Sequence, residues 1–372
     1  MINQILLVVI IIAIIYAIVI IAFTYGWRRI KPTLIHSDYK PNTQFSIIIP
    51  FYNEEDNIIN LLSDLEKIDY PKDKFEILLV NNESIDDTAI IIRDYIFQND
   101  SKMVLYNSAG GKKEAVWKGI NEAEHDYVLS LDGDCRIPPL LLKNYDIELQ
   151  KRDLKFISGP VAFVSKGKFW GRFMEFEFMS LVASGAGAIG VGLPIMANAA
   201  NMVFETKVAL KAEHVYNSDI ASGDDVFLLN YVIKNYGRKY VGFLKSEDSI
   251  VTTEAPLSLN SWVNQRLRWA SKAKGYSINA TSITALVILG FNMTTIALLI
   301  LSFLSIKYLY VLVIILLFKT IIDFQILKMS SIFFSKRPLL KYIFIFETIY
   351  PFYIVIISFA ALFHKKEWKD EM

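Results

Sequence analysis

The chain has few cysteines and histidines, and this scarcity excludes several kinds of protein. Its one cysteine, Cys135, cannot form an internal disulfide, which excludes a disulfide-stabilised secreted domain and fits a reducing cytoplasm. The four histidines show no metal-ligand spacing, so a zinc site has no support. The net charge of +1 gives no bulk attraction to nucleic acid, and we expect no nucleic-acid partner.

Several nucleotide-binding and catalytic patterns are also missing. The chain has no G-x-x-x-x-G-K-[ST] loop, which excludes a P-loop enzyme. It has no G-x-G-x-x-G either, which leaves a nicotinamide-dependent enzyme without its main support. No Ser-His-Asp set and no repeat period is visible. Any chemistry must therefore come from other polar clusters.

Charge is distributed unevenly along the 372 residues. Residues 1–27 carry no charge and residues 278–363 carry only 8, whereas residues 28–277 carry 63, the density of a soluble domain. We therefore predict an N-terminal membrane anchor at 1–27, a globular domain at 28–277, membrane helices at 278–363 and a polar tail at 364–372. This distribution excludes a soluble enzyme and a disordered protein.

The N-terminal apolar run, residues 5–23, is long enough to cross about 30 Å of hydrocarbon. A cleaved signal peptide is the alternative, but it requires a positively charged start, and the first four residues are uncharged. Trp27, Arg28 and Arg29 follow the run and are typical of the cytoplasmic end of a membrane helix. We predict an integral protein of the inner or plasma membrane, with its N-terminus outside and residues 28–277 in the cytoplasm.

Three further apolar runs predict about three C-terminal membrane helices, at 278–306, 308–327 and 342–363. Lys319 and Asp323 lie four residues apart, so we expect them to neutralise each other inside the helix bundle. The basic loop between the last two runs belongs inside. Four spans would place the basic tail outside, so either the tail is an exception to the positive-inside rule or one run is re-entrant or interfacial.

Short β-branched runs alternate with helical patterns in the first half of the globular domain. The predicted strands are 45–49, 76–80, 103–106 and 127–131. Three helices are predicted: one that begins near residue 54, one that ends at residue 95, and one at 112–122. This alternation predicts a parallel sheet with helices on both faces, where ligands bind outside the carboxyl ends of the strands. Polar clusters fall at those ends: residues 53–54, 81–87, 110–112 and 132–134.

Three polar clusters can carry chemistry, and each also has a structural interpretation. Asp132-Gly133-Asp134 offers carboxylates that suit Mg²⁺ or Mn²⁺, although Asp-Gly is also ordinary turn chemistry. Gly110-Gly111-Lys112 opens a helix and can bind an anion there, or it is a simple turn and cap. In Ser222-Gly223-Asp224-Asp225 the acids can cap a helix, while Asp225 can serve as a general base.

Two further segments mix aromatic and charged residues. Residues 166–182 do so at near-helical spacing, which predicts an amphipathic helix on the membrane surface. A second interfacial helix is expected at about 256–275. It contains Gln265-Arg266-Leu267-Arg268-Trp269, which either anchors the chain at the interface or belongs to the site.

In order, these motifs resemble the membrane-bound inverting glycosyltransferases of family 2. Relatives in that family include the catalytic subunits of cellulose, chitin, hyaluronan and poly-N-acetylglucosamine synthases. The resemblance runs from Phe45 to about Gly275 and rests on five motifs that follow the family order. They are residues 47–54, residues 80–88, the G-G-K-x-x-A loop at 110–115 with the D-x-D at 132–134, the acidic pair at 224–225, and the Q-x-x-R-W at 265–269.

The resemblance implies a GT-A fold, a Rossmann-like α/β domain that binds nucleotide sugars. It also implies inverting, metal-dependent transfer from a nucleotide-diphosphate sugar, a UDP-sugar, to a saccharide or lipid-linked acceptor in polysaccharide or glycolipid synthesis. The implied donor-binding residues are Pro50, Tyr52, Asn53, Glu54, Asn81, Asn82, Ser84, Gly111, Lys112, Asp132 and Asp134, of which Asp132 and Asp134 would hold Mg²⁺ or Mn²⁺. The implied catalytic residues are Asp225 as base, Asp224 and Arg268, and the implied acceptor-binding residues are Gln265, Trp269 and Asn201.

The sequence departs from the family pattern in two places. Asn81 and Asn82 replace the usual aspartates that contact the nucleobase, and Asp224 replaces a glutamate while leaving Asp225 in register. One alternative is a polyprenyl-phosphate sugar synthase, a class that generally lacks Q-x-x-R-W. Another is an inert membrane subunit of a polysaccharide synthase or export complex. The presence of the carboxylates expected for the metal and the base argues against this alternative. Synthase or export subunits are also candidate partners of an active enzyme.

Overall fold

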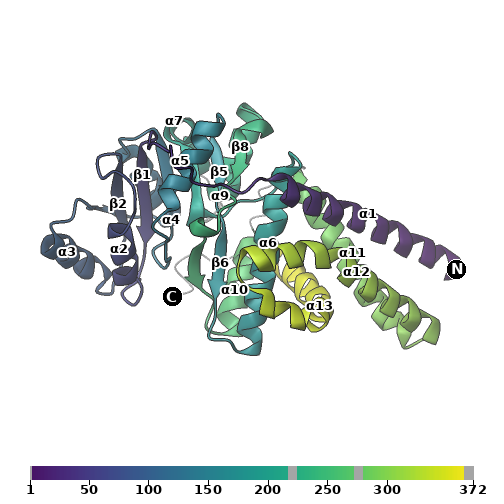
Figure 1. Cartoon of the computed structure of the whole chain (residues 1–372). Coiled ribbons are helices and arrows are strands. Elements are labelled where there is room, and N and C mark those ends of the chain that lie inside the picture. Colours follow the sequence, from purple (N-terminus) through teal and green to yellow (C-terminus); the bar gives the residue numbers. More distant parts are fainter. Residues whose placement is uncertain (1, 217–223, 272–279, 364–372) are drawn as a thin grey trace. The chain divides into compact units, whose positions relative to one another are not determined.

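The computed structural model describes residues 2–216, 224–271 and 280–363, which form two compact units (Figure 1). The helical unit contains the described residues of Met1–Arg29, Lys166–Ile195 and Pro256–Lys366. The sheet unit contains Ile30–Ser165 and the described residues of Met196–Ala255. The predicted continuous block 28–277 is therefore divided between the two units.

A seven-stranded mixed sheet is the centre of the sheet unit. Its strands are β1 (Phe45–Phe51), β2 (Phe75–Asn82), β3 (Val104–Ser108), β4 (Tyr127–Ser130), β5 (Phe156–Ser158), β7 (Met202–Glu205) and β8 (Val241–Phe243). They lie in the order β3-β2-β1-β4-β7-β5-β8. A second sheet pairs β6 (Val161–Val164) with β9 (Val251–Glu254) in parallel.

The predicted parallel pairing is confirmed for β1 to β4 and wrong for the sheet as a whole. β1 pairs in parallel with β2 and β4, and β2 with β3. β7, however, runs antiparallel to β4 and β5. The prediction missed β5, β7 and β8 because these strands have only three or four residues, too few to show a periodic pattern.

Helices accompany the sheet along the chain. They are α2 (Ile58–Glu66), α3 (Thr88–Asn99), α4 (Lys112–Glu122), α5 (Leu141–Lys151), α7 (Thr206–Lys211), α8 (Glu213–Tyr216) and α9 (Asp224–Asn235), with short 3₁₀ turns at Ala199–Asn201, Arg238–Tyr240 and Glu247–Ser249. All seven residues of β1 are buried. α4 packs closely on this strand, because a Cβ at Gly119 would lie 2.5 Å from a methyl group of Ile48.

Asp146 on α5 ties the segment before β1 to the domain. Its buried carboxylate accepts hydrogen bonds from the Tyr39 hydroxyl at 2.7 Å and from the Thr43 hydroxyl at 2.6 Å. The backbone amides of Asn42 and Thr43 and the Gln150 side chain add three more, at 2.9 to 3.0 Å. Burial alone would raise the pKa of Asp146, but these hydrogen bonds outweigh it and the pKa is lowered.

The helical unit contains four helices that are long and apolar enough to cross a membrane: Gln4–Arg29, Ala280–Ser302, Ile306–Phe333 and Arg337–Ala361. These belong to α1 (Ile2–Arg29), α11 (Ala280–Ser302), α12 (Ile306–Phe333) and α13 (Ile343–Ala361), the last preceded by the 3₁₀ helix η5 (Arg337–Tyr342). α6 (Phe169–Gly190) and α10 (Leu259–Ser271) complete the unit. The prediction of one N-terminal and three C-terminal membrane helices is confirmed by length and composition.

α6 differs from the amphipathic surface helix expected at 166–182. It continues to Gly190 and buries seven consecutive residues, Phe173–Met179, so both of its faces are covered in this stretch. Its glycines permit close packing on α1, because a Cβ at Gly187 would fall on the carbonyl oxygen of Phe23. The charges of α6 made it resemble part of a soluble domain, yet Glu175 and Glu177 are buried and paired with Lys336 and Arg266.

The expected pair of Lys319 and Asp323 is confirmed, and it belongs to a larger buried cluster. The Lys319 ammonium lies 2.6 Å from Asp323 and also pairs with Glu347 on α13. The Tyr16 hydroxyl on α1 donates to the Asp323 carboxylate at 2.8 Å. Because all four residues are at least 93% buried, the cluster connects α1, α12 and α13 through polar contacts that lipid cannot replace.

Candidate functional site

The loops after β1, β2 and β4 and the first turn of α4 meet at one edge of the sheet, as the strand pattern predicts. The residues brought together there are Asn53, Glu54, Asn81, Asn82, Ser84, Gly111, Lys112, Asp132 and Asp134. Pro50 lies within β1 opposite Val80 of β2, and Tyr52 follows that strand. We call this set the sheet-edge site.

Hydrogen bonds join the β1 loop to the β2 loop. The Asn53 amide donates to the Ser84 hydroxyl at 3.1 Å, and the Asn53 side-chain oxygen accepts from the Ile85 amide at 3.0 Å. The Ser84 amide in turn donates to the side-chain oxygen of Asn81 at 2.9 Å. Asn53 adopts a positive φ of 52°, a conformation that asparagine tolerates better than most residues. These contacts give both loops a fixed shape.

Asn82, the last residue of β2, positions the glycine loop before α4. Its side-chain oxygen accepts a hydrogen bond from the Gly111 amide at 2.9 Å. The side chain is completely buried, and its Nδ2 has no hydrogen-bond partner among the residues that the structure describes. A buried donor without a partner is costly and is usually explained by a strained site or an unseen ligand.

The glycine loop presents an open helix N-terminus. Gly111 has a φ of 103°, a region that glycine occupies without strain, and no atom lies within 4 Å of a Cβ placed on it. Lys112 begins α4, and its ammonium lies 2.5 Å from the Asp132 carboxylate. Backbone amides and a lysine at a helix start are the groups that bind a phosphate.

Asp134 and Asp132 follow β4 on either side of a close backbone contact. A Cβ at Gly133 would lie 3.0 Å from that of Phe51 and 3.2 Å from the Glu54 side chain, so the β4 loop packs against the β1 loop. The Thr253 hydroxyl on β9 donates to the Asp134 carboxylate at 2.6 Å. No local sequence pattern predicts this contact, because Thr253 lies 119 positions further along the chain.

The sheet-edge site concentrates negative charge. Burial and the carboxylates of Asp134 and Asp132 raise the pKa of Glu54 to about 8. Burial and the neighbouring Asp132 also raise the pKa of Asp134. Within the described ranges no group of three or more metal-ligating side chains occurs. Two carboxylates still fit a divalent cation whose other ligands are substrate phosphates and water, and such a cation would offset this repulsion.

Asp225 lies in the first turn of α9. It is buried, and its carboxylate accepts a hydrogen bond from the Val226 amide at 2.8 Å. The Lys113 ammonium lies 5.2 Å from the centroid of the Phe227 ring, which brings the start of α9 beside the start of α4. Asp224 is the first residue of α9, whereas Ser222 and Gly223 lie outside the described residues.

Gln265, Arg268 and Trp269 lie on α10 in the helical unit. Sequence reasoning missed their buried neighbour Arg266, whose guanidinium lies 2.6 Å from the Glu177 carboxylate on α6. Arg266 also lies 4.2 Å from the centroid of the Trp269 ring and donates weakly to Gln265 at 3.4 Å. The arginine inside the predicted motif therefore supports the two side chains that were predicted to bind the acceptor.

Asn201 has a different environment from an acceptor-binding residue. It is completely buried and accepts a hydrogen bond from the Tyr145 hydroxyl at 2.7 Å. Its Nδ2 donates to the carbonyl oxygens of Pro160 at 2.9 Å and Ser249 at 3.1 Å. Since the amide is used entirely within the core of the sheet unit, we leave Asn201 out of the proposed acceptor site.

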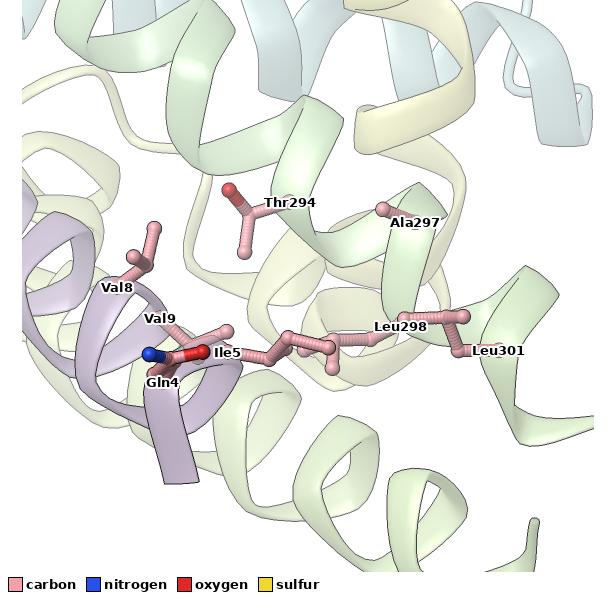
Figure 2. A pocket seen from close by; sticks show the side chains of 8 residues that line it. All are labelled: Gln4, Ile5, Val8, Val9, Thr294, Ala297, Leu298 and Leu301. Carbon is pink, nitrogen blue, oxygen red and sulfur yellow. The ribbon is translucent and has the colours of Figure 1, made fainter. Parts of the chain in front are cut away.

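The helical unit also contains an apolar cavity of about 340 Å³ between α1 and α11. Figure 2 shows side chains from both helices around it, and most of them are aliphatic. The lining residues are Gln4, Ile5, Val8, Val9, Thr294, Ala297, Leu298 and Leu301. None of them belongs to a predicted motif.

Comparison with known proteins identifies related sequences. The family model described as glycosyl transferase family 2 matches residues 46–181, and that described as glycosyl transferase family group 2 matches residues 127–363. The chain is 28% identical over 258 residues to a poly-β-1,6-N-acetyl-D-glucosamine synthase of Staphylococcus epidermidis, a match that covers 64% of this chain and 57% of that protein. It is 26% identical to the enzyme of the same name from Staphylococcus aureus, covering 69% and 61%. The chain thus spans little more than half the length of these relatives.

A solved structure supports the fold. The mannosyltransferase PcManGT from Pyrobaculum calidifontis, in complex with GDP-Man and Mn²⁺, aligns with a TM-score of 0.61 and 16% identity over 96% of this chain and all of that one. The predicted GT-A-like architecture is confirmed, and so is the recognition of the family from its motifs. Because the second family model covers more than half of the residues, the chain belongs to glycosyltransferase family 2.

Proposed function

We propose that this protein transfers a sugar from a UDP-sugar to a saccharide or lipid-linked acceptor at the membrane, with inversion at the anomeric carbon. The sheet-edge site carries this proposal, because hydrogen bonds hold three strand-end loops around one lysine and a group of carboxylates. This arrangement suits a nucleoside diphosphate accompanied by a cation. The structural relative's complex with GDP-Man and Mn²⁺ supports the same ligand class.

Each donor group has a candidate partner in the sheet-edge site. The Lys112 ammonium would bind the diphosphate at the start of α4, where the space beside Gly111 is open. Asp132 and Asp134 would hold Mg²⁺ or Mn²⁺, which would neutralise charge on the leaving nucleoside diphosphate. Asn81 would face the nucleobase, where an amide can donate or accept a hydrogen bond. The buried Asn82 would act through the glycine loop that it holds.

Transfer would then be a single displacement. Asp225 would take the proton of the acceptor hydroxyl, whose oxygen attacks the anomeric carbon as the bond to the diphosphate breaks. Asp224 would add negative charge beside this base, and Arg268 would stabilise the departing diphosphate. Gln265 and Trp269 would hold the acceptor, with the Trp269 ring stacking on a sugar. No covalent glycosyl-enzyme is needed.

The names of the staphylococcal relatives make UDP-N-acetylglucosamine the first donor to test. The purified full chain in detergent should release UDP from one member of a panel that also contains UDP-glucose and GDP-mannose. Release should require Mn²⁺ or Mg²⁺ and should fall to background in Asp134→Asn. Failure of every donor to bind in the presence of either cation would reject the proposal and favour an inert subunit. A lipid-extractable sugar phosphate would instead identify a polyprenyl-phosphate sugar synthase.

A further inference from the structure

Two segments of the helical unit together carry an excess of positive charge. The first is residues 166–175, at the start of α6, and the second is residues 336–346, which covers η5 and the start of α13. Together they contain six basic residues and one acidic residue. We call the five basic residues other than Lys336 the basic rim; they are Lys166, Lys168, Arg172, Arg337 and Lys341.

Contacts between side chains hold the two segments side by side. The Arg172 guanidinium donates to the Tyr342 hydroxyl. The Lys336 ammonium lies 2.9 Å from the Glu175 carboxylate, and the Phe169 and Phe346 rings pack edge to face with centroids 5.7 Å apart. These contacts bring residues about 170 positions apart in the sequence into one surface region.

The charge of the basic rim is not neutralised within the part of the chain that the structure describes. Glu175 is the only acidic residue of the two segments, and it is paired with Lys336. No described carboxylate forms an ion pair with any of the five rim residues. Lys166, Lys168, Arg337 and Lys341 are also exposed. The rim therefore carries uncompensated positive charge that attracts anions.

Tyr342 contacts two residues of the rim. The Arg172 guanidinium is 5.4 Å from the centroid of its ring, and the Lys341 ammonium is 5.0 Å from it. The ring of Phe346 stacks on Tyr342 with centroids 5.4 Å apart, so the tyrosine is supported from the interior. Two cations from different segments are thus held within reach of a common anionic group.

Exposed apolar side chains adjoin the rim. Phe169 and Trp170 on α6 are 40% and 41% exposed, and Phe344 and Ile345 on α13 are 62% and 51% exposed. Basic residues beside exposed aromatic and aliphatic ones are typical of the membrane–water interface. A soluble anion would use only the charges, whereas a lipid would also cover the apolar surface beside them.

We propose that the basic rim binds the headgroups of anionic phospholipids, with a headgroup phosphate near Arg172, Lys341 and Tyr342 and the acyl chains against the apolar side chains of α13. Charge complementarity and the adjoining apolar surface select this occupant over a free phosphate. The inference is independent of the proposed transfer reaction, since it concerns no residue of the sheet-edge site or of α10.

The proposal can be tested by lipid retention on the purified full chain. Native mass spectrometry of the protein in detergent, titrated with phosphatidylglycerol or phosphatidylcholine of identical acyl chains, measures bound lipid directly. Phosphatidylglycerol should bind more tightly, and Arg172→Gln with Lys341→Gln should weaken its binding roughly thirtyfold, since each basic residue near an anionic surface contributes about 1 kcal/mol. Binding should also weaken at high salt.

A matched control removes two exposed lysines of the sheet unit, Lys67→Gln and Lys207→Gln, and should leave lipid retention unchanged. If the Arg172 substitution prevents folding, Lys341→Gln alone should still weaken lipid binding. Lys341→Arg, which keeps the positive charge, should bind phosphatidylglycerol as tightly as the unaltered protein. Equal loss in the control variant, equal retention of both lipids, or displacement of phosphatidylglycerol by inorganic phosphate would overturn the proposal. Preference for undecaprenyl phosphate over phosphatidylglycerol would overturn it as well, in favour of an acceptor site.

Discussion

At the scale of single residues, Asp225 is the proposed base, and its substitution separates chemistry from donor binding. Asp225→Asn keeps the acceptor oxygen that bonds the Val226 amide but cannot take a proton. We expect turnover to fall by roughly 10²- to 10⁴-fold, the range of general-base catalysis, with donor affinity unchanged. Turnover is measured by UDP release and affinity by calorimetry. Asp153→Asn, at an exposed position, is the matched control, and ordinary turnover of Asp225→Asn would show that the base is elsewhere.

Asn82 tests the departure from the family's aspartates. Asn82→Ala removes the oxygen that accepts from the Gly111 amide, so the glycine loop loses its anchor. We expect the KM for the donor to rise roughly threefold to tenfold, the effect of one hydrogen bond, with a smaller change in kcat. Asn82→Asp retains an acceptor oxygen and should keep a KM near that of the unaltered protein. If both variants lose affinity equally, the orphaned Nδ2 is the important group.

At the scale of elements, Asp146 makes the attachment of residues 39–43 to α5 dependent on pH. Its folded pKa is lowered, so the carboxylate contributes stability above its unfolded pKa of about 3.9, and this contribution is lost as the pH falls through the folded value. Asp146→Ala should therefore lower the free energy of unfolding by about 3 kcal/mol at pH 7 and by less below pH 4. Thermal unfolding between pH 3.5 and 8 measures both. Asp153→Ala should show no such pH-dependent difference.

The stability of the protein should depend on which charges are removed from the buried cluster of Lys319, Asp323 and Glu347. Lys319→Met leaves two carboxylates buried without their cation, which should cost about 3–5 kcal/mol. Adding Asp323→Asn and Glu347→Gln removes the unpaired charges and keeps an acceptor for the Tyr16 hydroxyl, so most of the stability should return. Monodispersity and the thermal midpoint in detergent report the result. A triple variant as unstable as Lys319→Met would mean that the ammonium itself is required.

Sequence patterns predict those elements whose signals are local. The helix predicted at 112–122 begins and ends at the observed residues of α4, because paired glycines precede it and its apolar residues recur at helical spacing. Contacts made by distant residues leave no such signal, and this is why Thr253 beside Asp134 and the Arg266–Glu177 pair were missed. The unit boundary was missed for a related reason. The charged residues of α6 raise the charge density of its segment to that of a soluble domain. Ion pairing nevertheless allows the helix to be buried.

At the scale of the whole molecule, the distribution of basic residues predicts which loops lie on the cytoplasmic side. Arg28 and Arg29 end α1, and Arg337 and Lys341 lie between α12 and α13, whereas the turn between α11 and α12 at residues 303–305 carries no charge. By the positive-inside rule the first two regions should face the cytoplasm and the turn should face outside. This topology would place the sheet unit in the compartment where nucleotide sugars are made.

Cysteine labelling tests this topology, because the chain has one native cysteine and it is buried. In a Cys135→Ser background, Leu304→Cys should react with a membrane-impermeant maleimide in intact cells, since Leu304 is 79% exposed. Arg337→Cys should react only after permeabilisation. The background protein should stay unlabelled throughout, and both variants should label fully once the membrane is opened. Protection of Leu304→Cys together with labelling of Arg337→Cys in intact cells would invert the orientation, and a transferase that uses a cytoplasmic donor could not then work from this unit.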